Sequence, residues 1–258
     1  MVITGGTRGI GFGMAREFLR RGHRVTVCGR SEAGTERAAV LLAAGPGGER
    51  LTALPCDVGD PDQVRMLWEE AVKRGGAVDV WINNAGLTNP SRDLWELGAG
   101  VFEEVVRTNV LGVMHGSKVT MRGMLEQGHG QIYNMEGLGG DGMVCPGAVV
   151  YGATKSAVTY LTRGLVKEAK RTPVLVGFLS PGIAATDLIS EEDRESARRV
   201  LNSLADRVET MAPFLVERIL ADDRHGARID WLPKRKLAWR LARIPFDRRD
   251  PFAPAGSR

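Results

Sequence analysis

Short runs of β-branched and other apolar residues alternate along this chain with segments whose apolar residues recur every three or four positions. Such runs occupy residues 1–4, 24–28, 51–56, 78–82, 131–135, 174–179 and 227–232. Helical spacing marks the segments after the first and third runs, at Ile10, Met14, Phe18 and at Val64, Leu67, Trp68, Ala71. This alternation predicts an α/β doubly wound fold, in which helices flank a central parallel sheet.

The pattern continues without a break, and the 258 residues suit one compact domain over 1–258. A polar, helix-prone segment at roughly 186–211 is predicted to form a lid above the strand ends. Roughly 233–258 is predicted to be a basic C-terminal tail with a short amphipathic helix. Its expected apolar side carries Leu237, Leu241 and Ile244, and its expected polar side carries Lys236, Arg240 and Arg243.

The net charge of +4 comes from the C-terminal part of the chain, because residues 224–258 contain ten Lys and Arg but only three Asp. Three interpretations stay open: packing on the domain or on a second copy of the chain, peripheral contact with a membrane surface, and contact with a bulky anionic ligand. Nucleic acid is not expected as a partner, because no basic motif interleaved with aromatic residues accompanies the patch.

Cys28, Cys56 and Cys145 are far apart, so the sequence predicts neither a metal site nor a disulfide framework. The first residues already have the pattern of a strand, and no run of about 18 apolar residues occurs. We therefore expect a soluble, cytoplasmic protein without a signal peptide or a membrane span.

The stretch TGGTRGIG, residues 4–11, lies between a predicted strand and a predicted helix. Gly5, Gly9 and Gly11 allow the backbone to approach a pyrophosphate, and the free amides at the helix start favour its charge. This context predicts the dinucleotide site of a Rossmann fold.

An NAD enzyme places an acidic residue after its second strand to bind the ribose hydroxyls, but this chain has Arg30 there. Arg30 and Arg8 could bracket a 2′-phosphate through charge-assisted hydrogen bonds, which favours NADPH over NADH. The alternative is that both arginines are solvated surface residues.

Tyr151 and Lys155 are four residues apart, so a helix places them on one face. Reduction of a carbonyl requires a proton at the oxygen as negative charge develops there. A phenol beside an ammonium group can supply that proton, and the pair therefore indicates acid–base chemistry.

Further motifs follow in order: CDV at 56–58, NNAG at 83–86, TNVLG at 108–112, YGATK at 151–155 and SPGIAAT at 180–186. With them the sequence resembles the short-chain dehydrogenase/reductase family over nearly its whole length. The resemblance implies Tyr151 as general acid, Lys155 as a ribose ligand that lowers the tyrosine pKa, and Asn109 as the anchor of a relay water. It also implies a homo-oligomer. The implied NADPH/NADP⁺ site consists of Gly5, Thr7, Arg8, Gly9, Ile10, Gly11, Arg30, Asp57, Val58, Asn84, Ala85, Gly86, Tyr151, Lys155, Pro181, Gly182, Ile183 and Thr186.

The stretch NMEGLGGDG at 134–142 and the basic tail resemble the chlorophyll b reductase branch, which reduces the 7-formyl group to 7-hydroxymethyl with NADPH. This implies a tetrapyrrole substrate, chlorophyll b or chlorophyllide b. The serine that the wider family carries on this turn falls at Gly137 or Leu138. We interpret Glu136 as an acceptor for loop amides, with contact to the substrate carbonyl by a protonated Glu136 as the less favoured reading.

Two other functions fit the same residues. One is an NADPH-dependent reductase of another aldehyde or ketone, which would turn over small carbonyl compounds without pigment. The other is a non-catalytic NADPH-binding sensor, against which the joint presence of Tyr151, Lys155 and Asn109 argues.

Overall fold

The computed structural model describes residues 1–244 and 249–253, apart from the side chains of residues 193 and 196. The parts of the predicted tail at 245–248 and 254–258 lie outside the described residues. Among the residues described, no helix is both long enough and apolar enough to cross a membrane.

Within these residues, a seven-stranded parallel sheet has the order β3-β2-β1-β4-β5-β6-β9. Its strands are β1 (Val2–Thr4), β2 (Val25–Gly29), β3 (Leu51–Pro55), β4 (Val80–Asn83), β5 (Gly130–Met135), β6 (Val174–Ser180) and β9 (Arg228–Asp230). Each falls on one of the predicted runs. The strand order reverses between β1 and β4, which is where doubly wound sheets open a crevice for ligands.

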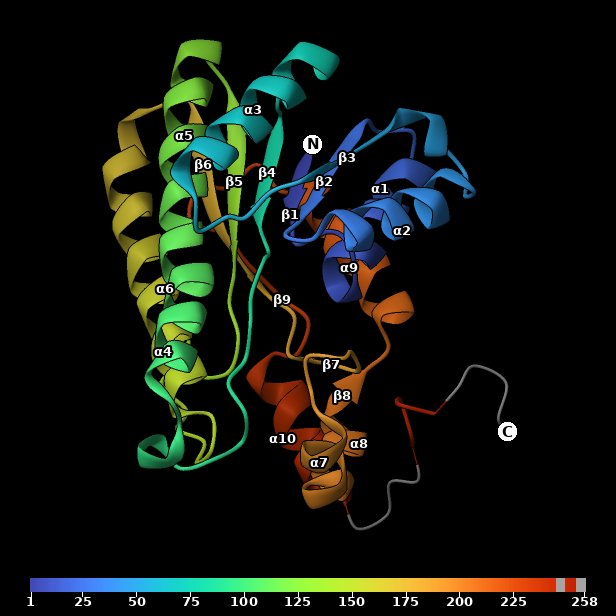
Figure 1. The fold of residues 1–258 in the computed structure, drawn as a ribbon, viewed down its shortest axis with the longest axis vertical. Helices are drawn as coiled ribbons and strands as arrows, with labels where there is room; N and C mark the ends of the chain where they lie inside the picture. Colours follow the sequence, from blue (N-terminus) through green and yellow to red (C-terminus); the bar gives the residue numbers. More distant parts are fainter. Residues whose placement is uncertain (245–248, 254–258) are drawn as a thin grey trace.

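Helices cover both faces of the sheet (Figure 1). One face carries α1 (Gly9–Arg20), α2 (Glu32–Ala43) and α9 (Val208–Ala221), and the other carries α3 (Pro61–Gly75), α4 (Ala99–Val106), α5 (Gly112–Gln127) and α6 (Val149–Glu168). Side chains alternate along the strands, so Ile3 joins the core under α1 and α9 while Val2 joins the core under α3 and α5. The sheet is therefore buried on both faces, as parallel sheets are. The predicted fold class is confirmed.

Short elements complete the chain. They are the 3₁₀ turns η1 (Gly48–Arg50), η2 (Leu94–Glu96) and η4 (Ala169–Arg171), and the π-helical turn η3 (Arg107–Leu111). The lid region contains α7 (Glu191–Ser196) and α8 (Arg198–Leu204), closed at its base by the parallel pair β7 (Ile183–Ala184) and β8 (Ala205–Asp206). The tail contains α10 (Lys234–Arg243).

The lid is shorter than predicted. Met211 falls within the predicted lid, but it lies in α9 and is fully buried. Helix α9 packs against α1 and belongs to the core. The segment above the strand ends therefore finishes at the β7-β8 pair (Figure 1).

The predicted division of the tail helix into an apolar and a polar side is wrong at two positions. Arg240, assigned to the polar side, is 7% exposed, whereas Leu241 is 45% exposed. The reason is Asp206, whose carboxylate accepts from Arg240 Nη1 at 2.7 Å and from Arg240 Nη2 at 3.0 Å. A buried carboxylate requires a charged partner, and this need outweighs the burial of one leucine.

Candidate active site

The glycine loop after β1 has a conformation that needs its glycines. Gly5 and Gly9 have φ angles of 63° and 56°, in the left-handed region that residues with a Cβ rarely adopt. A Cβ at Gly11 would lie 2.4 Å from the Gly5 carbonyl oxygen. Arg8 precedes α1 without a side-chain cap, so the first amides of α1 remain available to an anion.

The loop after β4 is tied to this glycine loop. The Asn84 side-chain amide donates to the carbonyl oxygens of Thr4, at 2.8 Å, and of Gly5, at 3.0 Å. The Thr4 hydroxyl accepts from the backbone amides of Asn84 and Ala85. On the opposite side, Thr186 lies over Gly9, since a Cβ at Gly9 would be 3.3 Å from the Thr186 methyl carbon.

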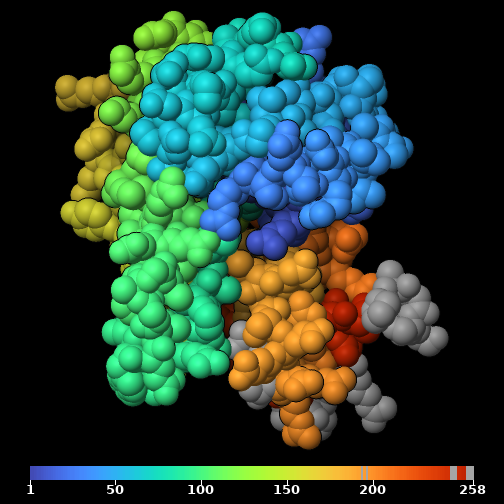
Figure 2. Space-filling view, in the orientation of Figure 1, coloured from blue at the N-terminus to red at the C-terminus, as the bar shows by residue number. Residues whose placement is uncertain are grey.

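These loops border one cavity of about 1430 Å³ at the carboxyl ends of the strands. Figure 2 shows the surface hollowed between the green layer that contains α4 and the orange lid. Each predicted cofactor residue lines it except Gly11, and Glu136, Gly137 and Leu138 line it too. Lid and tail residues close the remaining side: Leu188, Ile189, Leu201, Lys234 and Leu237.

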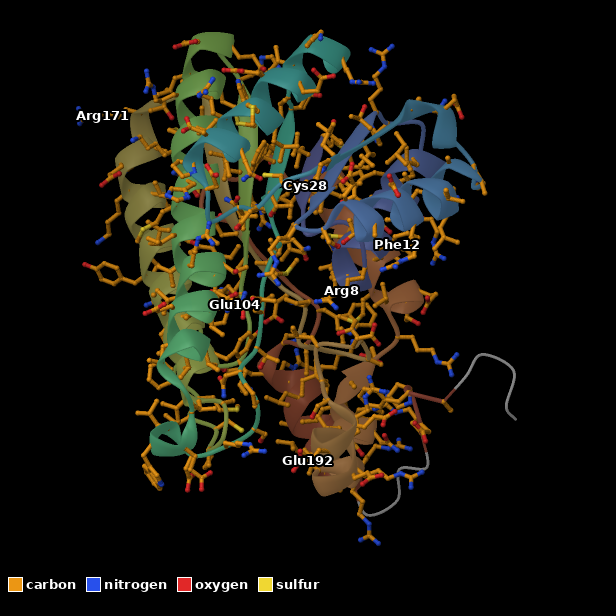
Figure 3. All side chains as sticks on the ribbon, viewed as in Figure 1. Arg8, Phe12, Cys28, Glu104, Arg171 and Glu192 are labelled. Carbon is orange, nitrogen blue, oxygen red and sulfur yellow. The ribbon has the colours of Figure 1, made fainter. Side chains whose placement is uncertain are left out.

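Three arginines line the cavity at the end formed by β2 and α2: Arg8, Arg30 and Arg37. Arg30 pairs with Glu104 at 2.6 Å, although both side chains are more than half exposed. Figure 3 shows the origins of these groups, with Arg8 at the start of α1 and Glu104 on α4. Sequence reasoning missed Arg37. Arg37 is three residues after Gly34 and four before Leu41, so helical spacing in α2 places it on the same cavity-lining face.

Asp57 follows β3 and also lines the cavity. Its Oδ1 accepts from the Gly59 amide at 2.9 Å, and its Oδ2 pairs with Arg107 at 3.0 Å. The carboxylate therefore fixes the turn after β3, and a role against the adenine stays a prediction.

Tyr151 and Lys155 lie on consecutive turns of α6. The Tyr151 amide donates to Asn89 Oδ1 at 3.0 Å, which fixes the start of the helix. The Lys155 ammonium donates to the Met135 carbonyl oxygen at 3.1 Å and lies 5.6 Å from the Tyr151 ring centroid. The helix thus brings the phenol and the amine together beside the end of β5.

Burial governs the ionisation of this pair. It raises the pKa of Tyr151 to about 12, and it lowers the pKa of Lys155 to about 8, against the opposing effect of the negative Glu136. Burial thus acts on the tyrosine pKa in the direction opposite to the effect expected of Lys155, and that role of Lys155 stays a prediction. At neutral pH the phenol keeps its proton, as a general acid must.

Asn109 occupies the π-helical turn η3 and is fully buried. Its side-chain amide donates to the Leu87 carbonyl oxygen at 2.8 Å and to Thr154 Oγ1 at 2.9 Å, and its Oδ1 accepts from the Leu87 amide at 2.7 Å. Both donors of the amide are engaged by protein groups. The side chain thus clamps the loop after β4 to α6, and the role of Asn109 as the anchor of a relay water stays a prediction.

Glu136 is 3% exposed and does not bind the loop amides as expected. Its Oε1 accepts from the Thr159 hydroxyl at 2.9 Å, and its Oε2 accepts from Arg228 Nη1 at 2.5 Å. Arg228 belongs to β9, which lies beside β6 at the far edge of the sheet. The carboxylate is thus anchored by the helix and by the last strand.

Comparison with known sequences identifies the family of the chain. A family model described as short chain dehydrogenase matches residues 1–197. The chain belongs to this family. Chlorophyll(ide) b reductase NOL of Arabidopsis thaliana is 39% identical over 233 residues, which cover 88% of this chain and 67% of that protein. Probable chlorophyll(ide) b reductase NYC1 of Oryza sativa is 32% identical, with 90% and 49% covered. These relatives place the chain in the chlorophyll b reductase branch of the short chain dehydrogenases.

The chain thus spans about two thirds of one plant relative and about half of the other. Both are described as chloroplastic, whereas composition led us to expect a cytoplasmic protein. Among solved structures, ElxO with NADP bound has a TM-score of 0.76 at 26% identity, over 89% of this chain and 95% of that chain. As a short chain dehydrogenase, the protein is an oxidoreductase that acts on C=O or CH–OH groups.

Gly137 is one of the two positions at which the serine of the wider short chain dehydrogenase family is predicted to fall. A Cβ there would lie 2.3 Å from the Tyr151 hydroxyl oxygen. Because the phenol already fills this space, the site leaves no room for a side chain at position 137. Leu138, the other candidate, lines the cavity and is 36% exposed.

Proposed function

We propose that the protein reduces the 7-formyl group of chlorophyll b or chlorophyllide b to 7-hydroxymethyl with NADPH. The observation that carries this proposal is the Tyr151 phenol beside Lys155 in a cavity of about 1430 Å³, large enough for a tetrapyrrole edge and a dinucleotide together. The plant relatives named chlorophyll(ide) b reductase support the choice of substrate.

The residues present fit a nicotinamide dinucleotide. The left-handed glycines, the uncapped start of α1 and the cavity-lining Asn84, Ala85 and Gly86 form a backbone cradle of the kind that accepts a pyrophosphate and its adenosine. Bound NADPH supplies the hydride. Tyr151 donates its proton to the carbonyl oxygen, and the Lys155 ammonium stabilises the phenolate that remains.

The test is incubation of the purified protein with NADPH and either pigment, followed by chromatography. We expect the 7-hydroxymethyl product to form, and Tyr151→Phe to abolish it while NADPH binding is retained. A wild-type protein that binds NADPH and reduces small carbonyl compounds but neither pigment would contradict the assignment of the substrate.

The preference for NADPH rests on the arginines beside β2 and α2. The Arg30–Glu104 pair is exposed, so it contributes little energy and a 2′-phosphate can displace Glu104. Loss of one phosphate contact costs about 1.5–3 kcal/mol, or roughly ten- to a hundredfold in affinity. Arg30→Ala and Arg37→Ala should each weaken NADPH by that factor and leave NADH nearly unchanged in fluorescence titrations.

Arg65, an exposed arginine of α3 paired with Glu69, offers the matched control. Arg65→Ala should leave the affinities for both cofactors unchanged. A wild-type protein that binds NADH more tightly than NADPH would show that the assignment is wrong.

For the tail we propose peripheral contact with an anionic lipid surface. Trp239 is 58% exposed on α10, and Arg243 lies 4.6 Å from the centroid of its ring. An exposed aromatic residue beside a cation is suited to the interface of a membrane. Sedimentation with phosphatidylglycerol vesicles, compared between wild type and Trp239→Ser, measures this contact.

We also propose a homo-oligomer that forms through α4 and α6. An apolar groove lies there, lined by Leu94, Phe102, Val106, Val110, Val149, Val150, Ala153, Thr154 and Ala157. Beside it, Trp95 is 82% exposed. Exposed apolar surface of this kind marks an interaction site. Light scattering of the wild type and of Val106→Asp reports the oligomeric state.

A further inference from the structure

A buried charged cluster lies behind the Tyr151–Lys155 pair. Its centre is Glu136, held by Thr159 at 2.9 Å and by Arg228 at 2.5 Å. The Arg228 guanidinium in turn lies 4.9 Å from the centroid of the Phe178 ring, which limits its movement. A carboxylate removed from water is retained only with such partners.

The cluster is joined to Lys155 in two ways. The Lys155 ammonium donates to the carbonyl oxygen of Met135, the residue directly before Glu136. Thr159, which donates to Glu136, lies one turn after Lys155 on the same face of α6. The carboxylate and the ammonium are therefore fixed relative to each other by the end of β5 and by one helix.

Burial and the charge of Glu136 act on Lys155 in opposite directions. Burial lowers the pKa of Lys155 to about 8, and the negative charge of Glu136 acts in the opposite direction. Burial also raises the pKa of Glu136, while Thr159, Arg228 and Arg163 favour its ionised form. The ionisable groups around this cluster are Tyr151 and Arg163 of α6 and Arg228 and Asp230 of β9.

Building on the proposed function, we propose that Glu136 is a positioning residue for carbonyl reduction. Its buried carboxylate, oriented by Thr159 and Arg228, keeps the Lys155 amine in the ammonium form beside Tyr151. The ammonium is needed because the phenol becomes a phenolate when its proton passes to the carbonyl oxygen. In this role Glu136 acts through Lys155 and not on the substrate.

Two substitutions separate charge from packing. Glu136→Gln keeps the size and removes the charge, whereas Glu136→Asp keeps the charge and removes one methylene. We expect Glu136→Gln to retain substantial activity at pH 6 and to lose it as the pH rises, with the alkaline limb about one pH unit lower than in wild type. One unit is a tenfold change in the ratio of ammonium to amine. Glu136→Asp should keep the alkaline limb of the pH–activity profile closer to that of wild type. If the limb of Glu136→Gln were instead closer to wild type than the limb of Glu136→Asp, Glu136 would have a packing role, which would overturn the proposal.

A second measurement needs no substrate. The ¹³Cε signal of Lys155 in lysine-labelled protein, assigned as the signal missing from Lys155→Met, reports the amine directly. It should titrate about one unit lower in Glu136→Gln and be unmoved in Glu17→Gln, which neutralises another buried glutamate paired with arginines. An unchanged Lys155 titration in folded Glu136→Gln would overturn the proposal. A shifted titration in a protein that fails to reduce pigment would instead contradict only the proposed function.

Discussion

A Cβ atom at Gly137 would lie 2.3 Å from the Tyr151 hydroxyl oxygen and 3.2 Å from two carbons of Lys155. We therefore expect Gly137→Ser to displace the phenol and to lower pigment reduction by at least tenfold, instead of restoring a family feature. Steady-state kinetics with pigment measures this. Gly164→Ser, on the helix α6 that carries Tyr151, is the control, because a Cβ at Gly164 meets no atom within 4 Å among the described residues. Activity equal to or above wild type in Gly137→Ser would contradict the steric argument.

Residues related by local geometry were predictable from the sequence, and residues related by the fold were not. Tyr151 and Lys155 are four apart, so helical periodicity alone places them together. The partner of Glu136, by contrast, is Arg228, 92 residues away. That contact requires β9 to pair with β6, which no local pattern specifies.

At the scale of elements, strands and helices followed the apolar pattern, but the orientation of α10 did not. The periodicity of α10 predicted an apolar side with Leu241 and a polar side with Arg240, whereas Arg240 is buried to reach Asp206 and Leu241 is exposed. Trp231 also donates to Asp206, at 2.6 Å. One buried carboxylate thus joins the base of the lid, the end of β9 and the tail helix. The charge of a distant partner cannot be read from a helical wheel.

Asp206→Asn should loosen this junction. Removing one partner of a buried ion pair costs about 3–5 kcal/mol, because the Arg240 guanidinium is left without its counter-charge. We expect the thermal midpoint to fall by roughly 6–20 °C. Because Leu201 of the lid and Leu237 of the tail line the cavity, KM for pigment should rise more than Kd for NADPH.

Asp250→Asn provides the control for this junction. Asp250 pairs with Arg198 at 3.6 Å and its side chain is 37% exposed, so its substitution should change the midpoint by less than about 2 °C. Equal effects of the two substitutions would show that Asp206 has no special role in joining the lid to the tail.

At the scale of the whole molecule, the cavity lies where the strand order of the sheet reverses, and the titratable pair Tyr151 and Lys155 is buried in it. The alternation of strands and helices was sufficient to predict this architecture, since β1 to β6 and their helices follow one another along the chain. It was not sufficient to predict the ionisation of the pair, because burial depends on the lid, the tail and the loops that meet around α6.

We expect the burial of Lys155 to lower the stability of the folded protein at neutral pH. The folded pKa of Lys155 is lowered from 10.5 to about 8, so below pH 8 the folded state carries a buried ammonium that the unfolded state would keep in water. The cost is complete below the folded pKa, and it disappears between pH 8 and 10.5 as the amine loses its proton in the folded state first. Allowing for the lost hydrogen bond to Met135, Lys155→Met should stabilise the protein by about 2 kcal/mol at pH 7.

In thermal unfolding, this should appear as a rise of roughly 4–8 °C at pH 7 that declines toward pH 10, together with loss of pigment reduction. Lys118→Met, at an exposed position of α5, should give no such rise. A Lys155→Met protein that is less stable than wild type at pH 7, or whose gain does not depend on pH, would show that the ammonium is not held at an electrostatic cost. The expected result would mean that the site retains a destabilising charge because the transfer of a proton from Tyr151 requires it.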